Sequence, residues 1–194
     1  MPRVIQGAIF DMDGTLTVPV LDFARMKAEI GVAQDMGLLE SMAAMSEAER
    51  AAAEVILLRH ELTAAAESVL NDGVSQALTE IAAMGIKTAI LTRNCAESVR
   101  IVLAKHDLRF DAVVSREDSR PKPDPDGVHV AARRIGVDPA ACVVVGDYEF
   151  DILVGKRAGS VTVLFSPTGR TFATVPDFQI RSMCGLPSLI RSLG

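Results

Sequence analysis

Short apolar runs alternate with amphipathic segments along most of the chain. The runs have the length of buried strands, and the segments between them repeat their apolar residues at helical spacing. Strands are predicted over residues 4–10, 86–91, 111–115, 141–145 and 161–165, with an edge segment at 178–180. Helices are predicted from 74 to the glycine at 85, and over 96–105, 126–135, 151–158 and 186–192. Strands that alternate with helices at this spacing predict a parallel sheet with helices on both faces.

Residues 18–72 differ from this pattern, because they are rich in Ala, Met and Glu and contain no convincing strand. One helix is predicted over 21–30. A capping box at Ser46 and Glu49 opens a second helical pattern that runs to residue 70, as one long helix or a broken pair. The prediction is an α/β fold, a Rossmann-like doubly wound parallel sheet formed by 1–17 and 73–194, with a small α-helical cap subdomain at 18–72. The cap is either a lid over the strand ends or simple packing material.

Composition narrows the class of protein. The 194 residues fit one domain with an insertion, and a hydrophobic share of 49% excludes disorder. No apolar run is long enough to span a bilayer, and the first one ends in acids rather than in a cleavage site, so we expect a cytoplasmic protein. A net charge of −5 does not favour binding to nucleic acid or to a membrane surface. An anionic substrate would therefore need a local group of positive charges.

The three cysteines, Cys95, Cys142 and Cys184, lack paired metal spacing and are predicted to be free thiols. Cys95 stands near a predicted helix start, a position that can lower the pKa of a thiol.

Two carboxylates follow the first predicted strand at once. Asp11 and Asp13 come directly after the run that ends at Phe10. Ligands of an open α/β sheet bind outside the carboxyl ends of its strands, which is where these two acids are expected. Like charges about 4 Å apart repel by roughly 4 kcal/mol at an effective dielectric of 20. A shared Mg²⁺ offsets that repulsion most simply, since it prefers carboxylate oxygens. The alternative at this point is that both acids only form and cap a turn.

Polar residues also follow three later strands of the predicted sheet. Thr92, Arg93 and Asn94 come after the strand at 86–91 and lead into a helix, whose free amides favour anions. Lys122 lies between two prolines in the loop after the next strand. After 141–145, an aspartate at 147 and another at 151 add hard oxygen ligands. Each residue alone has a structural explanation as a cap, a turn former or a surface charge, but the set converges on one edge of the sheet.

Four motifs in this order resemble those of the haloacid dehalogenase-like hydrolase superfamily. They are Asp11-Met12-Asp13-Gly14-Thr15, then Thr92, then Lys122-Pro123-Asp124-Pro125, then Gly146-Asp147 followed by Asp151. The helical insertion after the first motif resembles the cap of the phosphoglycolate-phosphatase-like branch, although 18–72 is short for that cap. The resemblance extends over the whole chain.

The resemblance implies a Mg²⁺-dependent phosphatase that acts on a small phosphorylated metabolite. Asp11 would be the nucleophile that forms an aspartyl-phosphate, and Asp13 the general acid and base. Thr92 and Lys122 would bind the phosphoryl oxygens. The ion would be held by the Asp11 carboxylate, the backbone carbonyl of Asp13, and Asp147, with Asp151 bonded to the ligands rather than to the ion. Arg93 and Asn94 are the residues outside the cap that are predicted to reach the substrate.

The aspartate at position 13 favours phosphate-ester chemistry, because dehalogenating and phosphonate-cleaving members of this superfamily replace it. Two other functions stay open. One is a phosphomutase or phosphotransferase on the same scaffold. The other is a non-catalytic phospho-accepting module that resembles response-regulator receivers, although receivers carry the acceptor on a later strand and lack a helical insertion after the first. The short cap makes phosphoglycolate itself an unsafe choice of substrate, and the sequence does not define the oligomeric state.

Overall fold

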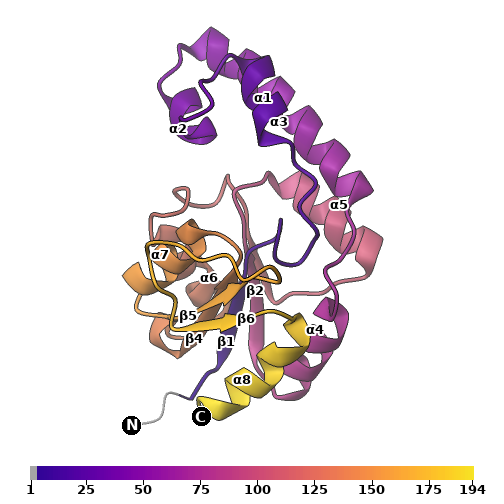
Figure 1. The fold of residues 1–194 in the computed structure, drawn as a ribbon, viewed down its shortest axis with the longest axis vertical. Coiled ribbons are helices and arrows are strands. Elements are labelled where there is room, and N and C mark those ends of the chain that lie inside the picture. Colours follow the sequence, from indigo (N-terminus) through magenta and orange to yellow (C-terminus); the bar gives the residue numbers. More distant parts are fainter. Residues whose placement is uncertain (1–3) are drawn as a thin grey trace.

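The computed structural model describes residues 4–194. At its centre is a six-stranded sheet in the order β3-β2-β1-β4-β5-β6, in which every neighbouring pair of strands is parallel (Figure 1). The strands are β1 (Gly7–Phe10), β2 (Lys87–Leu91), β3 (Ala112–Val114), β4 (Cys142–Gly146), β5 (Val161–Phe165) and β6 (Phe178–Ile180). The predicted α/β fold with a doubly wound parallel sheet is therefore confirmed.

Helices cover both faces of the sheet, because the central strands are apolar on both sides. β1, for example, is buried along its whole length, with Phe10 in the apolar cluster of one face and Ile9 in that of the other. The helices on the Phe10 face are α4 (Val74–Ala83), α5 (Ala96–His106) and α8 (Leu186–Ser192). Those on the Ile9 face are α6 (Asp126–Ile135) and α7 (Glu149–Arg157).

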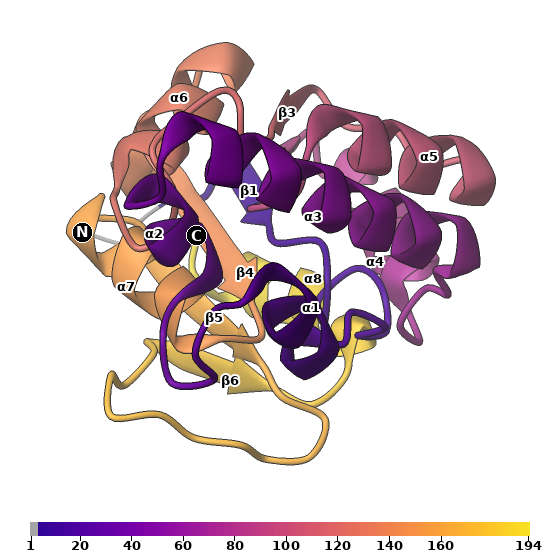
Figure 2. The same cartoon turned by 90° about the horizontal axis from the view of Figure 1, so that it is seen from above.

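A helical cap stands beyond the carboxyl ends of the strands, inserted between β1 and α4 (Figures 1 and 2). It consists of α1 (Phe23–Ile30), α2 (Leu38–Ala43) and α3 (Glu47–Glu67). The three helices enclose a small apolar cluster of their own around Met26, Met42 and Leu57. Two antiparallel connecting segments join the cap to the core, where the Val18 amide donates to the Val69 carbonyl oxygen at 2.8 Å. The exact division at residues 17/18 and 72/73 stays a prediction.

The helices of the cap differ from the sequence-based prediction at two places. The second helical pattern is one long helix, and Ser46 and Glu49 form the predicted capping box at its start. It ends at Glu67 rather than at residue 70, because Val69 and Leu70 pair with the segment that enters the cap. Helix α2 was not predicted. It has six residues, and its N-cap position is Gly37, which offers no side chain to cap the helix, so the helix carries almost no local signal.

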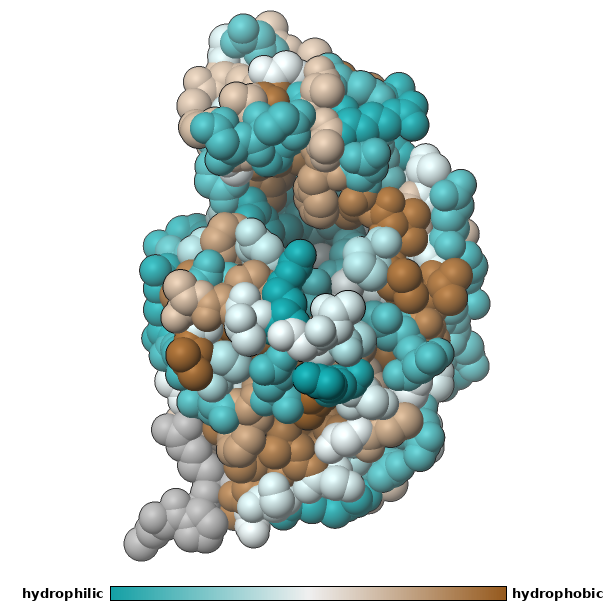
Figure 3. Space-filling view, viewed as in Figure 1, coloured by the Kyte–Doolittle hydropathy of each residue, from teal (hydrophilic) through white to brown (hydrophobic). Residues whose placement is uncertain are grey.

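The strand order places the ligand-binding edge. From β1 the chain builds outward through β2 and β3 on one side, and later through β4, β5 and β6 on the other. The order therefore reverses between β1 and β4, and the crevice outside the carboxyl ends of these two strands is where open α/β sheets bind ligands. Asp11 follows β1 at this point, and Asp147 follows β4. In the space-filling view the surface is hollowed between the cap and the core (Figure 3).

Candidate active site

Three aspartates meet at the reversal point of the sheet. Asp11 leaves β1 with its amide bonded to the Val145 carbonyl oxygen of β4 at 2.9 Å, which fixes the end of β1 against its neighbour. Asp147 follows β4, and Asp151 lies in the first turn of α7. One carboxylate oxygen from each aspartate lies within 4.8 Å of one from each of the others. The acids of the first and last motifs therefore share one edge of the sheet, as the sequence predicted.

Lys122 is the cation that faces these acids. Its side chain is only 5% exposed, and its Nζ lies 2.5 Å from Asp11 Oδ1 and 2.7 Å from Asp151 Oδ1. It is delivered by the loop that precedes α6, in which the Lys122–Pro123 peptide bond is cis. Burial lowers the pKa of Lys122, but the charges of Asp11 and Asp151 outweigh burial and hold it above its usual range. This lysine is therefore a fixed positive charge beside Asp11.

The single lysine leaves the acidic cluster undercompensated. Burial raises the pKa of Asp11 well above its usual range, although the charge of Lys122 opposes this. Burial, followed by the nearby charge of Asp151, raises the pKa of Asp147 to about 6. The raised pKa values of Asp11 and Asp147 mean that negative charge on these two carboxylates is unfavourable where they lie, unless a further cation is close by. A hard divalent cation fits this donor set of three partly buried carboxylates.

Asp13 has a different environment from the three clustered acids. Its Oδ1 accepts a hydrogen bond from the Thr17 hydroxyl at 3.3 Å, and its Oδ2 accepts one from the side-chain amide of Asn94. Burial raises the pKa of Asp13. A carboxyl group with a raised pKa, held by two hydrogen bonds at the same edge, is suited to give and take a proton near neutral pH.

The loop after β2 brings Thr92, Arg93 and Asn94 to the same edge. The buried Thr92 hydroxyl accepts the Asn94 amide hydrogen at 3.1 Å. Arg93 Nη2 donates to Glu40 of α2, at 2.8 and 3.0 Å from its two oxygens, and the guanidinium lies 5.4 Å from the centre of the Phe150 ring. Arg93 thus joins the cap to the first turn of α7, whereas Asn94 holds Asp13.

The start of α5 is not the open anion site that the sequence suggested. The Cys95 amide donates to Glu61 Oε2, and the Ala96 amide donates to Glu117 Oε2, each at 3.1 Å. Both amides are therefore bonded to carboxylates of the protein itself. Such contacts join residues far apart in the chain, so local sequence could not reveal them. The Thr92 hydroxyl, by contrast, remains at the edge where it was predicted.

The Cys95 thiol also differs from the sequence-based expectation. It is 5% exposed, and burial raises its pKa, so it lacks the reactivity of a thiolate at an open helix start. Among the described residues, Cys95, Cys142 and Cys184 are all free cysteines, as predicted.

A family model described as haloacid dehalogenase-like hydrolase matches residues 5–159. The chain belongs to this family. A haloacid dehalogenase-like hydrolase domain-containing protein of Arabidopsis thaliana is 29% identical over 97% of this chain and 84% of its own length. The pyrophosphatase PpaX of Bacillus velezensis is 32% identical, over 58% of this chain and 56% of its own length.

Structural comparison agrees with the family assignment at the level of the fold. The crystal structure of a predicted phosphoglycolate phosphatase from Haemophilus somnus superposes with a TM-score of 0.73 at 18% identity, covering 95% of this chain and 97% of that one. The predicted resemblance to capped haloacid dehalogenase-like hydrolases of the phosphoglycolate-phosphatase-like type is confirmed. The chain is thus a hydrolase of this family, and its substrate is not defined by these similarities.

Asn71 is a site residue of this hydrolase that the sequence reading missed. Its side-chain amide donates to the carbonyl oxygens of Thr15 and Thr17, both at 3.0 Å, and of Gly14 at 3.2 Å. It therefore holds the loop that carries Asp13 from the far end of the cap insertion. In the sequence, Asn71 comes directly after the helical pattern that runs to residue 70, and nothing local marks its long-range role.

Replacing Gly14 with alanine tests how closely this loop approaches the acidic cluster. Gly14 has a φ of +86°, and an added Cβ would lie 2.4 Å from Asp147 Oδ2. We expect a loss of more than about 2 kcal/mol of stability together with most of the activity, because both the backbone and Asp147 must move. Gly31→Ala is the matched control, since its φ is +83° but no atom lies within 4 Å of the added Cβ. Equal effects in urea unfolding would show that only backbone strain matters.

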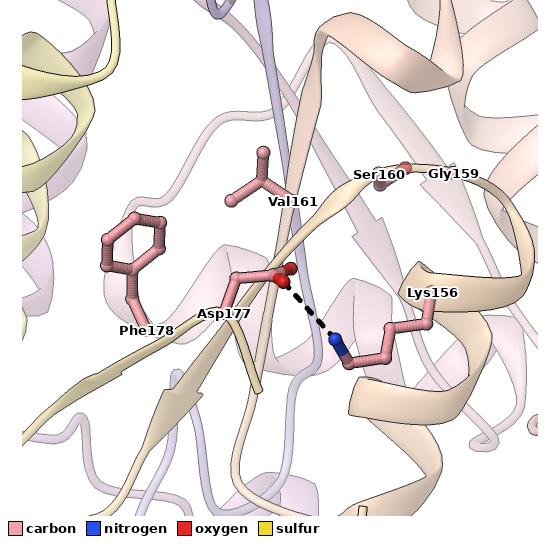
Figure 4. A pocket seen from close by; sticks show the side chains of 6 residues that line it. All are labelled: Lys156, Gly159, Ser160, Val161, Asp177 and Phe178. Atoms are coloured by element: carbon pink, nitrogen blue, oxygen red, sulfur yellow. Dashed lines mark hydrogen bonds and ion pairs between the residues drawn. The ribbon is translucent and has the colours of Figure 1, made fainter. Parts of the chain in front are cut away.

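A separate hollow lies at the opposite edge of the sheet. It is lined by Lys156, Asp177, Phe178 and the start of β5, and an ion pair of 3.2 Å joins Lys156 to Asp177 (Figure 4). Because it lies at the amino ends of β5 and β6, it is remote from Asp11, and none of the predicted site residues lines it. We assign the chemistry to the carboxyl edge.

No helix within residues 4–194 has the length and apolar character needed to cross a membrane.

Proposed function

We propose that this hydrolase is a Mg²⁺-dependent phosphatase that cleaves a small phosphorylated metabolite through an aspartyl-phosphate on Asp11. The observation that carries the proposal is the pairing of Asp11 with Lys122 at the end of β1, inside a partly buried group of three carboxylates. A phosphate ester brings negative charge to such a site, so both a lysine and a cation are needed there. The relative from Bacillus velezensis is named a pyrophosphatase, and hydrolysis at phosphorus supports the same reaction type.

In the first step, an Asp11 carboxylate oxygen attacks the phosphorus, and the bond from phosphorus to the leaving oxygen breaks. Asp13 gives its proton to that leaving oxygen, so the alcohol departs neutral. In the second step, water attacks the phosphorus of the aspartyl-phosphate while Asp13 takes a proton from the water. The bond to Asp11 breaks, inorganic phosphate leaves, and both carboxyl groups return to their starting states.

Two residues take up charge on the phosphoryl oxygens. Lys122 uses two of its three N–H groups on Asp11 and Asp151, which leaves one for the substrate. The Thr92 hydroxyl lies on the neighbouring strand end and supplies a second donor. Donors fixed in a buried site stabilise developing charge more than they do in water, because they need no reorganisation.

We propose that the acids that fit a cation have the roles that the family resemblance implies. We propose that Mg²⁺ is held by the Asp11 carboxylate, the Asp13 carbonyl oxygen and Asp147. Asp151 lies behind them, bonded to Lys122 and to the Tyr148 amide at 3.0 Å. When bound, the ion supplies positive charge that lets a carboxylate approach a phosphate dianion.

Arg93 and Asn94 remain the proposed substrate contacts outside the cap. Arg93 is held by Glu40, so an anionic part of the substrate would compete with that carboxylate for the guanidinium. The Asn94 amide already donates to Asp13, so a substrate oxygen that contacts Asn94 would lie beside the general acid. A phosphotransferase on the same site would pass the phosphoryl group to a sugar hydroxyl instead of to water, and adding sugar acceptors to the hydrolysis assay measures this.

Asp13→Asn tests the proton transfer at the centre of this mechanism. We expect kcat/KM, which reports only the steps up to departure of the leaving group, to fall about 10²- to 10⁴-fold on an alkyl phosphate and much less on p-nitrophenyl phosphate, whose leaving group needs no proton. Steady-state kinetics of both substrates with Mg²⁺ gives the comparison, and Asp35→Asn, an exposed aspartate of the cap, is the control. An equal loss on both substrates would contradict the role of Asp13 as the acid.

A further inference from the structure

Glu61 is a buried carboxylate that the proposed mechanism does not use. It lies in the cap helix α3, and only 2% of the residue is exposed. Its Oε1 pairs with the guanidinium of Arg116, and its Oε2 accepts the Cys95 amide hydrogen at 3.1 Å. Taking a carboxylate out of water is costly unless it is paired and hydrogen-bonded. Both oxygens of Glu61 have such partners, and both partners belong to the core rather than to the cap.

These partners enclose the loop that carries Thr92, Arg93 and Asn94. Glu61 binds the residue that follows the loop, through the Cys95 amide. Arg116 binds the loop itself, because its backbone amide donates to the Asn94 carbonyl oxygen at 2.9 Å and its guanidinium reaches the Arg93 carbonyl oxygen at 3.4 Å. The ion pair of Glu61 with Arg116 therefore fixes the backbone of Asn94 from both sides.

Asn94 connects the backbone of this loop to Asp13, the proposed general acid. Its side-chain amide donates to Asp13 Oδ2, and Asp13 accepts only one other side-chain hydrogen bond, from Thr17 at 3.3 Å, among the contacts of the described chain. A shift of the Asn94 backbone would move this amide and allow the Asp13 carboxyl to turn. A displacement of about 1 Å in such a group is enough to reduce catalysis strongly.

Glu61 is not needed merely to attach α3 to the core. The end of the same helix is attached separately by Lys105 of α5, whose Nζ donates to the carbonyl oxygens of Ala66 at 2.6 Å and Ser68 at 2.8 Å. The Ser68 hydroxyl also contacts His106 Nε2 at 2.9 Å. Among the hydrogen bonds and ion pairs of residues 4–194, two groups thus join the end and the middle of α3 to the core, and of these two the one with Glu61 reaches the catalytic loop.

We propose that Glu61 is a positioning residue of the cap, which acts through Arg116 and the loop at 92–95 to hold Asn94 against Asp13. This rests on the proposed function, because it assigns Asp13 the role of proton donor to the leaving group. It makes the long helix of the cap part of the acid–base machinery. Substrate contact by Glu61 is not required.

The test compares two substrates in Glu61→Gln, a substitution of the same size. Glutamine can accept the Cys95 amide hydrogen or turn its own oxygen to Arg116, but it cannot do both, so the loop loses one of its supports. We expect kcat/KM on an alkyl phosphate to fall about 10- to 100-fold, with a change of no more than about threefold in kcat/KM on p-nitrophenyl phosphate. In an Asn94→Ala background, the added loss from Glu61→Gln should disappear, because both changes act on one contact.

Lys105→Met is the matched control, since it removes the other attachment of α3 without touching the loop. It should leave the ratio of the two kcat/KM values unchanged. If Glu61→Gln does not fold, as judged by circular dichroism, the double variant Glu61→Met/Arg116→Met replaces the ion pair with apolar groups, which commonly preserves stability. It is expected to show the same selective loss.

The outcomes separate this inference from the proposed function. Equal losses on both substrates, or no loss, in the Glu61 variants would overturn the positioning role if Asp13→Asn keeps its selective effect. If Asp13→Asn itself does not lose more activity on the alkyl phosphate than on p-nitrophenyl phosphate, Asp13 is not the acid. The positioning role of Glu61 is then overturned with it.

Discussion

Replacing Asp11 with asparagine is expected to lower kcat on p-nitrophenyl phosphate by about 10⁴-fold or more, because the variant has no carboxylate oxygen to attack phosphorus. The amide also removes the charge that pairs with Lys122 at 2.5 Å. Acid quenching during turnover of a ³²P-labelled substrate gives a direct measurement. The wild-type protein should retain label that hydroxylamine releases, as expected for an acyl phosphate, and Asp11→Asn should retain none.

The fold of Asp11→Asn is expected to survive, because the substitution relieves repulsion within a crowded acidic cluster. Thermal unfolding without metal should therefore show no loss of stability relative to the wild type, which excludes misfolding as the cause of inactivity. Turnover at the wild-type rate, or label retained by the variant, would remove Asp11 from the role of nucleophile.

The position of the motif residues could be predicted because they follow strands. A run such as residues 4–10 is apolar on both faces and predicts a central parallel strand, and parallel strands end at one edge. Asp11, Thr92, Lys122 and Asp147 therefore had to converge once the alternation of strands and helices was recognised. This part of the prediction depends only on periodicity and on the rule that parallel strands share a direction.

Residues that support the site from a distance could not be predicted in the same way. Asn71 lies 57 positions from Gly14, and Glu61 lies 34 positions from Cys95, yet each forms a hydrogen bond that fixes a catalytic loop. In the sequence both look like ordinary helix or turn residues. Their roles follow from how the cap returns to the core, and no local pattern records that path. For the same reason the helix start at Cys95 was wrongly expected to be free for an anion.

The Asp147 carboxylate is expected to destabilise the metal-free protein at neutral pH, and Asp147→Asn tests this expectation. Burial raises the pKa of Asp147 to about 6 from a usual value of 3.8. The folded protein then binds a proton more tightly than the unfolded chain, so the metal-free protein loses stability as pH rises from about 4 to about 6. Above pH 6 the penalty is complete. Two pKa units correspond to about 3 kcal/mol, which is an upper limit for this single group.

Asp147→Asn removes this penalty and also removes a proposed ligand of Mg²⁺, so the two effects have opposite signs. At pH 7 without metal the variant should be more stable than the wild type by about 1–3 kcal/mol, and at pH 4 the difference should vanish. Asparagine keeps an oxygen for the Thr15 hydroxyl, which lies 3.3 Å from Asp147 Oδ1. Adding Mg²⁺ at pH 7 should stabilise the wild type far more than the variant, since binding to the folded state alone raises stability. Urea unfolding of both proteins at both pH values, with Mg²⁺ and with EDTA, measures the free energy of unfolding under each of these four conditions. If the variant is less stable than the wild type at pH 7 in EDTA, or is stabilised equally by Mg²⁺, then Asp147 stabilises the fold and is not a ligand of the ion.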